Sequence, residues 1–256
     1  MVGTMGRGLV GLAVALVAAL SAAPVSVPAN KPPPTRHVFI VTLENKSFEA
    51  TFGSDPGAKY LAGPLARKGA LLTQYYGTGH FSLGNYITMI SGQSENPLTQ
   101  ADCPMFSEFL FAGVGGGGQA LGGGCVYPPQ IRTIAGQLEE AGLTWRGYMQ
   151  DMGADPAREP ATCAHPAIGA SDNTQRATAT DQYATRHNPF VYFHSVIDDR
   201  ASCDAHVVNL NRLPHDLRKA KRTPNYAFIT PDLCADGHDE TCADPSQPAG
   251  YAGIDG

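Results

Sequence analysis

The sequence predicts an α/β fold for residues 37–256, with a mostly parallel sheet flanked by helices. Three apolar runs have the composition of core strands, and segments with helical periodicity lie between them. Alternating strands and helices favour parallel strands, because each crossover helix returns the chain to the same end of the sheet. The three predicted strands cover residues 38–43, 144–148 and 226–230.

The first of these strands begins with VFIV, a continuous apolar run, so we expect it to be buried on both faces. The second reads TWRGY and the third YAFIT, and both combine aromatic or β-branched residues with a small one. Chemistry-bearing residues follow the first strand and the third, which makes the carboxyl end of the sheet the place to look for a site.

Three segments have helical patterns, at residues 60–68, 83–90 and 131–141. In the second, apolar side chains recur at the spacing of one helix face. The third is followed by Gly142, a residue well suited to a helix C-terminus. We expect these helices to cover the two faces of the sheet.

Two long segments read as loops. Residues 113–124 (GVGGGGQALGGG) lack the Lys-Ser/Thr ending of a phosphate-binding loop and do not join a strand to a helix, so we expect a mobile surface loop. Residues 154–180 are rich in Pro, Ala, Thr and Asp. After Pro231 we expect no further strand or helix. Since a doubly wound sheet usually has about five or six strands, either weaker strands escape notice or the domain is truncated at its C-terminal end.

The first 29 residues have the pattern of a secretory signal peptide. Arg7 precedes an apolar run at residues 9–20 that is too short for a comfortable membrane span, and small residues follow it. An uncleaved anchor is the weaker alternative. Residues 30–36 form a Pro-rich spacer before a single domain at 37–256. We expect a secreted, periplasmic or cell-surface protein with no stable membrane span after cleavage.

The charge balance and the cysteines narrow the class of protein. Without the signal, 17 basic residues face 23 acidic ones, which argues against a nucleic-acid partner. Six cysteines in an exported chain indicate disulfides, which we pair in sequence order. The alternative is a metal site at Cys234, His238 and Cys242, and export disfavours it. The expected pairs are Cys103–Cys125, Cys163–Cys203 and Cys234–Cys242.

Glu44 and Asn45 follow the first strand at its carboxyl end. Their side chains offer hard oxygen ligands that suit a divalent cation. The alternative is structural: Glu44 would face solvent and Asn45 would cap a turn. A bound cation would supply the local positive charge that an acidic chain needs to bind an anionic substrate.

Ser82 lies at or near the N-terminus of the helix predicted at 83–90. Such a serine is most often a simple helix cap. The same position attracts phosphate through free N–H groups, and a hydroxyl there can attack phosphorus when a metal lies close. Asn85, one turn later, could donate to a phosphoryl oxygen. The role of His80 stays open: it could be an acid, a metal ligand or a packed polar residue.

Asp236 and His238 follow the third strand, separated by a glycine that permits a sharp turn. They could reach one metal or phosphate site, or they could belong to an acidic loop held by its cysteines. His187, in the segment RHNPF, is equally well interpreted as a buried histidine or as part of a site.

The chain resembles the secreted bacterial and fungal phosphoesterase family that contains phospholipase C and acid phosphatases, within the alkaline phosphatase superfamily. The resemblance implies that Glu44 and Asn45 bind metal and that Ser82 is the nucleophile that becomes phosphorylated. Ser82 and Asn85 match the spacing of a family motif. The segments that carry the resemblance are LENKSFEATFG, GHFSLGNYITMISG, WRGYMQDM, RHNPFVYF and PDLCADGHD.

By the same resemblance, His187, Asp236 and His238 are phosphate-binding or metal-shell residues. One departure is clear: the family supplies an acidic pair after a late apolar strand, and this sequence has none, which again indicates truncation. The resemblance implies a metal-dependent phosphoric ester hydrolase, acid phosphatase-like, with a phosphoserine intermediate and a small phosphate-ester substrate. The identity of the divalent metal ion stays open. The alternatives are a phospholipase C-type phosphodiesterase acting on a phospholipid, and an inactive fragment or binding module.

Overall fold

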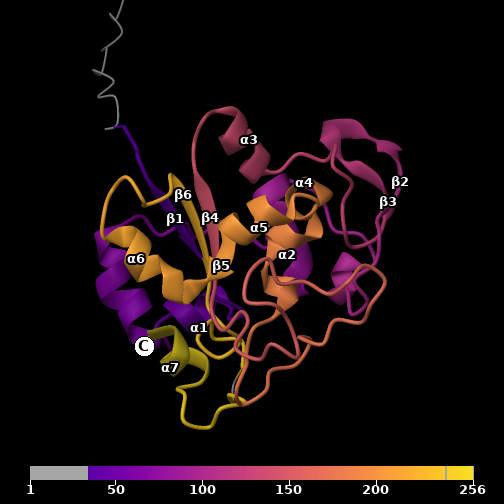
Figure 1. Ribbon diagram of the computed structural model, residues 1–256. Coiled ribbons are helices and arrows are strands. Elements are labelled where there is room, and N and C mark those ends of the chain that lie inside the picture. The colour runs from indigo at the N-terminus through magenta and orange to yellow at the C-terminus, as the bar shows by residue number, and fades with distance from the viewer. Residues whose placement is uncertain (1–33, 240, 256) are drawn as a thin grey trace, which may run out of the picture. The chain divides into compact units, whose positions relative to one another are not determined.

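Four parallel strands form the central sheet in the spatial order β1-β6-β4-β5 (Figure 1). They are β1 (Val38–Val41), β4 (Trp145–Met149), β5 (Val207–Asn209) and β6 (Tyr226–Thr230). The structure, a computed structural model, describes residues 34–239 and 241–255. The predicted signal peptide and residues 30–33 of the spacer lie outside this range. The expected parallel sheet is confirmed.

Side chains on the two faces of the sheet enter two different cores. Trp145, Met149 and Phe228 face the larger core, to which helices α2 (Ser82–Ser91), α3 (Ile134–Glu140), α4 (His194–Ile197) and α5 (Arg200–His206) contribute. On the opposite face, Tyr148, Ala227 and Ile229 pack near Leu213 of α6 (Leu213–Leu217). Figure 1 shows α2 to α5 on one side of the sheet and α6 on the other. The sheet is therefore flanked by helices as predicted.

The predicted helices are confirmed to different degrees. The helix expected at 83–90 is α2, and the one expected at 131–141 begins later, at Ile134, after the Thr133 cap. The one expected at 60–68 is a π-helical turn (Leu61–Leu65) followed by a 3₁₀ turn (Ala66–Lys68). Pro64 lies inside it and lacks the N–H that a regular α-helix requires.

Several elements differ from expectation or were not foreseen. The glycine-rich segment is an antiparallel hairpin of β2 (Leu110–Val114) and β3 (Ala120–Gly123), so the expected loop at 113–124 was wrong. Helix α7 (Gly250–Asp255) follows Pro231, where no helix was expected. The segment at 154–180 is irregular, as predicted. The other short elements are α1 (Phe48–Phe52) and 3₁₀ turns at Thr99–Ala101, Gly116–Gly118, Thr185–His187, Pro189–Tyr192 and Leu210–Arg212.

Strand β1 is not buried on both faces. Phe39 is 43% exposed and Val41 55% exposed, because β1 is an edge strand that has β6 on one side only within the described chain. Ile40 points to the opposite face and packs against the larger core. The apolar run therefore predicted the strand correctly, but it did not predict that one face of the strand is exposed.

Three disulfides join Cys103 to Cys125, Cys163 to Cys203 and Cys234 to Cys242. The pairing in sequence order is confirmed, and the alternative metal site with two of these cysteines is excluded because both are bonded to each other. Among the described residues, no helix has the length and apolarity needed to cross a membrane.

Candidate active site

The site lies where the carboxyl ends of β1 and β6 meet the start of α2. The Glu44 N–H donates to the carbonyl of Asp236 at 2.9 Å, which joins the segment after β1 to the segment after β6. The hydroxyl of Thr230, the last residue of β6, donates to the carbonyl of His187 at 3.2 Å. Because β1 and β6 are parallel neighbours, their carboxyl ends share one edge of the sheet. Glu44, Asp236 and His187 therefore lie together at this edge. Ser82, at the start of α2, is the fourth predicted residue beside them.

A continuous chain of polar contacts runs through these four side chains. The Ser82 hydroxyl donates to Glu44 Oε2 at 2.8 Å. The other oxygen of that carboxylate, Oε1, lies 2.8 Å from His187 Nε2. On the far side of the imidazole, Nδ1 lies 3.3 Å from Asp236 Oδ2. Glu44 is thus the central group, since it contacts both the hydroxyl and the imidazole.

The charges of Glu44 and His187 stabilise each other. Burial by itself would raise the pKa of Glu44, but the charge and close contact of His187 and the hydrogen bond from Ser82 lower it to about 2. Burial would lower the pKa of His187, but the Glu44 charge and the contacts with Asp236 and Glu44 raise it to about 9. Near neutral pH the pair is a carboxylate and an imidazolium, so neither is an effective base toward Ser82.

Tyr86, one turn after Ser82 on α2, closes the site from inside the protein. Its ring stacks on the His187 imidazole with centroids 5.0 Å apart and planes 7° apart. Burial first, and then the charges of Glu44 and Asp236, raise the pKa of the Tyr86 hydroxyl. The stacked ring restrains the plane of the imidazole.

The side chains of Glu44, His187 and Asp236 fit a divalent cation. One ligand atom from each lies within 4.8 Å of the others. Glu44 Oε1, both ring nitrogens of His187 and Asp236 Oδ2 are buried, and none meets hydrogen-bond geometry within the described chain. Two carboxylates and an imidazole suit Mn²⁺, Fe²⁺ or Zn²⁺. His187 would release its proton to solvent when such an ion binds.

Ser82 is the first residue of α2, and Phe81 occupies the N-cap position. The hydroxyl donates to Glu44 instead of accepting from a helix N–H, so the interpretation of Ser82 as a simple cap is wrong. The backbone N–H of Leu83 is taken by Asp102 Oδ1 at 2.9 Å. Ser82 is 6% exposed and borders two cavities.

The remaining residues predicted from GHFSLGN lie around the serine. Asn45 and His80 are exposed and line both cavities. The Asn85 amide donates to the carbonyls of Gly79 and Phe81 at 3.1 and 2.8 Å, so it holds the loop that precedes Ser82. Its hydrogen bond to a phosphoryl oxygen stays a prediction.

The turn that carries Asp236 and His238 depends on Gly237. Its φ is +93°, and a Cβ there would lie 2.3 Å from Ile254 and 3.0 Å from the Glu44 carbonyl oxygen. Asp236 Oδ1 accepts from the His238 N–H at 2.7 Å. The two imidazoles of His187 and His238 lie edge to face, with centroids 6.0 Å apart. The glycine thereby places both residues of the Asp-x-His element beside His187.

Three nearby residues were missed by the sequence analysis. Arg186, Asp102 and Gln175 line the smaller cavity beside Ser82. Arg186 directly precedes His187 in the RHNPF segment, and this adjacency was the one sequence feature that could have indicated a place near the site. Asp102 and Gln175 lie in irregular segments, where no pattern singles them out.

The fold and site define an α/β protein in which a serine, carboxylates and histidines gather at strand carboxyl ends. The chain belongs to the phosphoesterase family, because the model of that family matches residues 60–251. No solved structure is significantly similar to the chain.

Curated relatives carry phosphatase names. The phosphate-repressible acid phosphatase of Penicillium chrysogenum is 27% identical over 199 residues, which is 78% of this chain and 38% of that protein. The probable acid phosphatase of Kluyveromyces lactis is 25% identical over 206 residues, or 80% and 39%. The phosphatidylinositol-3-phosphatase of Mycobacterium tuberculosis is 26% identical over 219 residues, or 86% and 57%. The chain thus spans about two fifths to three fifths of the length of these three relatives.

Proposed function

We propose that the chain carries out metal-dependent hydrolysis of phosphate monoesters through a phosphoserine at Ser82. The observation that carries this proposal is the contact between the Ser82 hydroxyl and Glu44 Oε2, at the start of a helix and beside buried His187. The family match and the acid phosphatase names of the relatives support the reaction class.

Glu44, His187 and Asp236 would hold the cation, and Asn45 is a further candidate ligand. When bound, a divalent cation lowers the pKa of a serine hydroxyl and neutralises phosphate charge. His187 then serves as a ligand, while His238 and Asn85 remain candidates for binding the phosphoryl oxygens.

Ser82 Oγ gives up its proton and forms a bond to phosphorus as the ester P–O bond breaks, and the departing alcohol takes up a proton. Water then attacks the phosphoserine, the P–Oγ bond breaks, and Ser82 recovers its proton. Glu44 orients the hydroxyl through its hydrogen bond, and Tyr86 together with Asp236 keeps the imidazole in place.

Substituting Ser82 with Ala tests the proposal. We expect the variant to keep its melting temperature and metal content, and to lose ³²P labelling by substrate together with turnover. Labelling or full turnover by the purified variant would refute the assignment to Ser82. A parent chain that binds no divalent cation and releases no phosphate is instead an inactive fragment or a binding module.

A second activity has a specific observation in its favour. The larger cavity beside Ser82 has apolar residues on its wall, among them Val41, Tyr75 and Met89, which suit the lipid part of a phospholipid diester. Comparing p-nitrophenyl phosphate with a phosphocholine diester separates a monoesterase from a phospholipase C-type diesterase. We propose, too, that the chain is exported, which its three disulfides support.

A further inference from the structure

Two cavities of different character meet at Ser82. The larger, of about 650 Å³, has the apolar wall that includes Val41, Tyr75 and Met89. The smaller, of about 250 Å³, is polar. The cavities share Ser82, Asn45 and His80, so a phosphorus atom bound at the serine would have both within reach. The residues of the smaller cavity that the larger one lacks are Phe81, Asp102, Gln175, Arg186 and His238.

Arg186 is the charged residue of the smaller cavity that has unused hydrogen-bonding capacity. Its side chain is 7% exposed. Nη1 donates to the carbonyl of Gln175 at 3.1 Å, and this is the guanidinium's one hydrogen bond within the described chain. Nε lies 3.9 Å from Asp102 Oδ2, which is beyond hydrogen-bond distance. A guanidinium has five N–H groups, so most of them remain available in the cavity.

Asp102 faces this arginine at a distance too long for a hydrogen bond, and its other oxygen is engaged elsewhere. Its Oδ1 accepts the N–H of Leu83 at the start of α2. The positions of Asp102, Arg186 and Ser82 are therefore linked through one helix terminus. The ion pair with Asp102 is long, at 3.9 Å, so an anion in the cavity could accept hydrogen bonds from the guanidinium that Asp102 does not.

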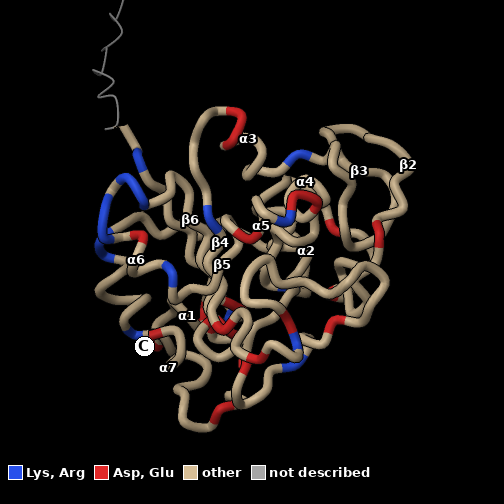
Figure 2. Tube along the Cα trace, viewed as in Figure 1, with Lys and Arg blue, Asp and Glu red and all other residues tan. Residues whose placement is uncertain are grey.

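The position of Arg186 is unusual for this acidic chain. Figure 2 shows many of the Lys and Arg residues at and after α6, including residues 212–222, on the other side of the sheet from α2. Arg186 instead lies beside the candidate nucleophile, together with the imidazoles of His80 and His238. A guanidinium recognises phosphate through two parallel N–H donors, a geometry that lysine cannot supply.

We propose that Arg186 binds the non-bridging oxygens of the phosphoryl group, while the alcohol part of the substrate occupies the larger, partly apolar cavity. This inference rests on the proposed function and specifies its substrate: a phosphate monoester with an apolar alcohol. A monoester presents a doubly charged phosphoryl group that fits a small polar cavity containing an arginine. A diester would need to place a second alcohol there.

The test uses the full chain loaded with a divalent cation and measures the affinity for inorganic phosphate by calorimetry. We expect Arg186→Gln to weaken phosphate binding about tenfold to a hundredfold, as for the loss of hydrogen bonds to a charged group. Arg186→Lys keeps the charge but not the paired donors, and its affinity should fall between those of the parent and Arg186→Gln. The exposed Arg176→Gln is the matched control and should bind phosphate as the parent does.

Melting temperatures separate binding from folding. If Arg186→Gln does not fold, Arg186→Lys decides, and added guanidinium should restore part of the phosphate affinity of a folded variant. A folded Arg186 variant with unchanged phosphate affinity overturns the inference. This measurement needs no turnover, so it stays informative even if Ser82 never becomes phosphorylated.

Steady-state kinetics test the apolar side of the inference. Met89→Gln should reduce the preference for 1-naphthyl phosphate over glycerol 2-phosphate and leave the affinity for inorganic phosphate unchanged. Equal catalytic efficiency of the parent toward both esters would overturn the assignment of the larger cavity to the alcohol.

Discussion

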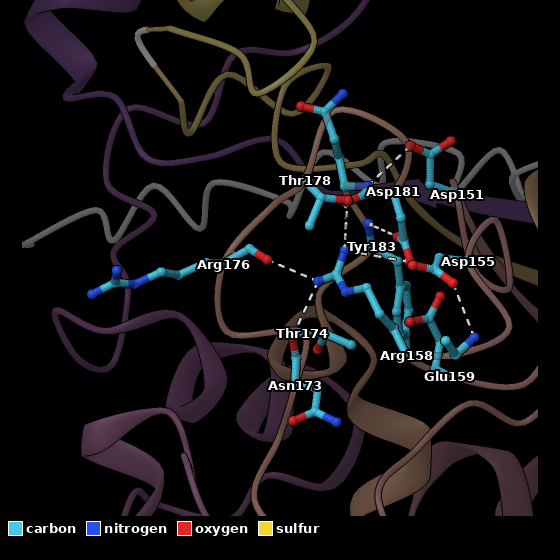
Figure 3. Close-up of polar contacts among 12 residues, drawn as sticks. Asp151, Asp155, Arg158, Glu159, Asn173, Thr174, Arg176, Thr178, Asp181 and Tyr183 are labelled. Carbon is cyan, nitrogen blue, oxygen red and sulfur yellow. Dashed lines mark hydrogen bonds and ion pairs between the residues drawn. The ribbon is translucent and has the colours of Figure 1, made fainter.

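Glu159 and Asp181 form a buried carboxyl pair away from the candidate site (Figure 3). Glu159 is 4% exposed and Asp181 is fully buried. Glu159 Oε1 accepts from the Gly153 N–H at 2.9 Å, but Glu159 Oε2 and Asp181 Oδ2 have no hydrogen-bond partner among the described residues while both are ionised. In the described part of the chain, the cation beside them is Arg158, 3.4 Å from Asp181 Oδ2. One positive charge serves two carboxyls, so we expect the pair to retain one proton.

That proton determines how stability varies with pH. Burial first, and then the hydrogen bond and charge of Asp181, raise the pKa of Glu159 to about 8. A carboxyl with a raised folded pKa keeps a proton that the unfolded chain releases. Its full contribution is present below the unfolded pKa, 4.5, and is lost as the pH rises through the folded value.

Glu159→Gln removes this dependence. The Gln amide carries N–H donors at every pH, so it can satisfy Asp181 Oδ2, and its oxygen can still accept from Gly153. At about 1.36 kcal/mol per pH unit, the parent should lose roughly 2 to 3 kcal/mol between pH 5.5 and 7.5 through this pair. For a domain of this size that corresponds to a fall in melting temperature of roughly 4 to 12 °C relative to the variant.

The assay is thermal unfolding followed by circular dichroism at several pH values. Parent and Glu159→Gln should melt at similar temperatures near pH 5 and diverge as the pH rises, with the variant the more stable. Exposed Glu140→Gln is the matched control and should follow the parent. Parallel curves for the parent and Glu159→Gln would show that Glu159 is already ionised at pH 5.5 and would refute the shared proton.

Two further variants test the fold. Phe228→Ala should cost about 3 to 5 kcal/mol in chemical denaturation, because its ring is fully buried between sheet and helices, whereas Phe39→Ala on the exposed face of β1 should cost much less. Asp216→Asn should cost about 2 to 3 kcal/mol at pH 7, since the buried carboxylate is paired with Arg146 and Arg212. Burial opposes ionisation, but those partners among others lower the pKa of Asp216 to about 2, so the stability difference should disappear as the pH falls from 4 toward 2. A difference that persists at pH 2 contradicts this account.

The sheet was predictable from sequence where strands are apolar and alternate with helices. The strand at 226–230 matches β6 residue for residue, and it is buried throughout. The exposure of β1 was not predictable, because an apolar run reveals what a strand can bury and not which neighbour covers it. β5 has three residues, too few to show a period.

The site was predictable where parallel topology brings distant residues together. Glu44 and Asp236 follow strands that turned out to be neighbours, so their convergence follows from the shared edge. The place of His187 between them was not predictable, because it comes from an irregular segment whose path depends on packing. Arg186 was missed for the same reason.

The disulfide between Cys234 and Cys242 closes the segment that carries Asp236 and His238. In a reducing compartment this loop has no covalent closure. The positions of Asp236 and His238 are then no longer restrained by the disulfide. The proposed phosphate chemistry is therefore linked, through this loop, to the oxidation state of two cysteines.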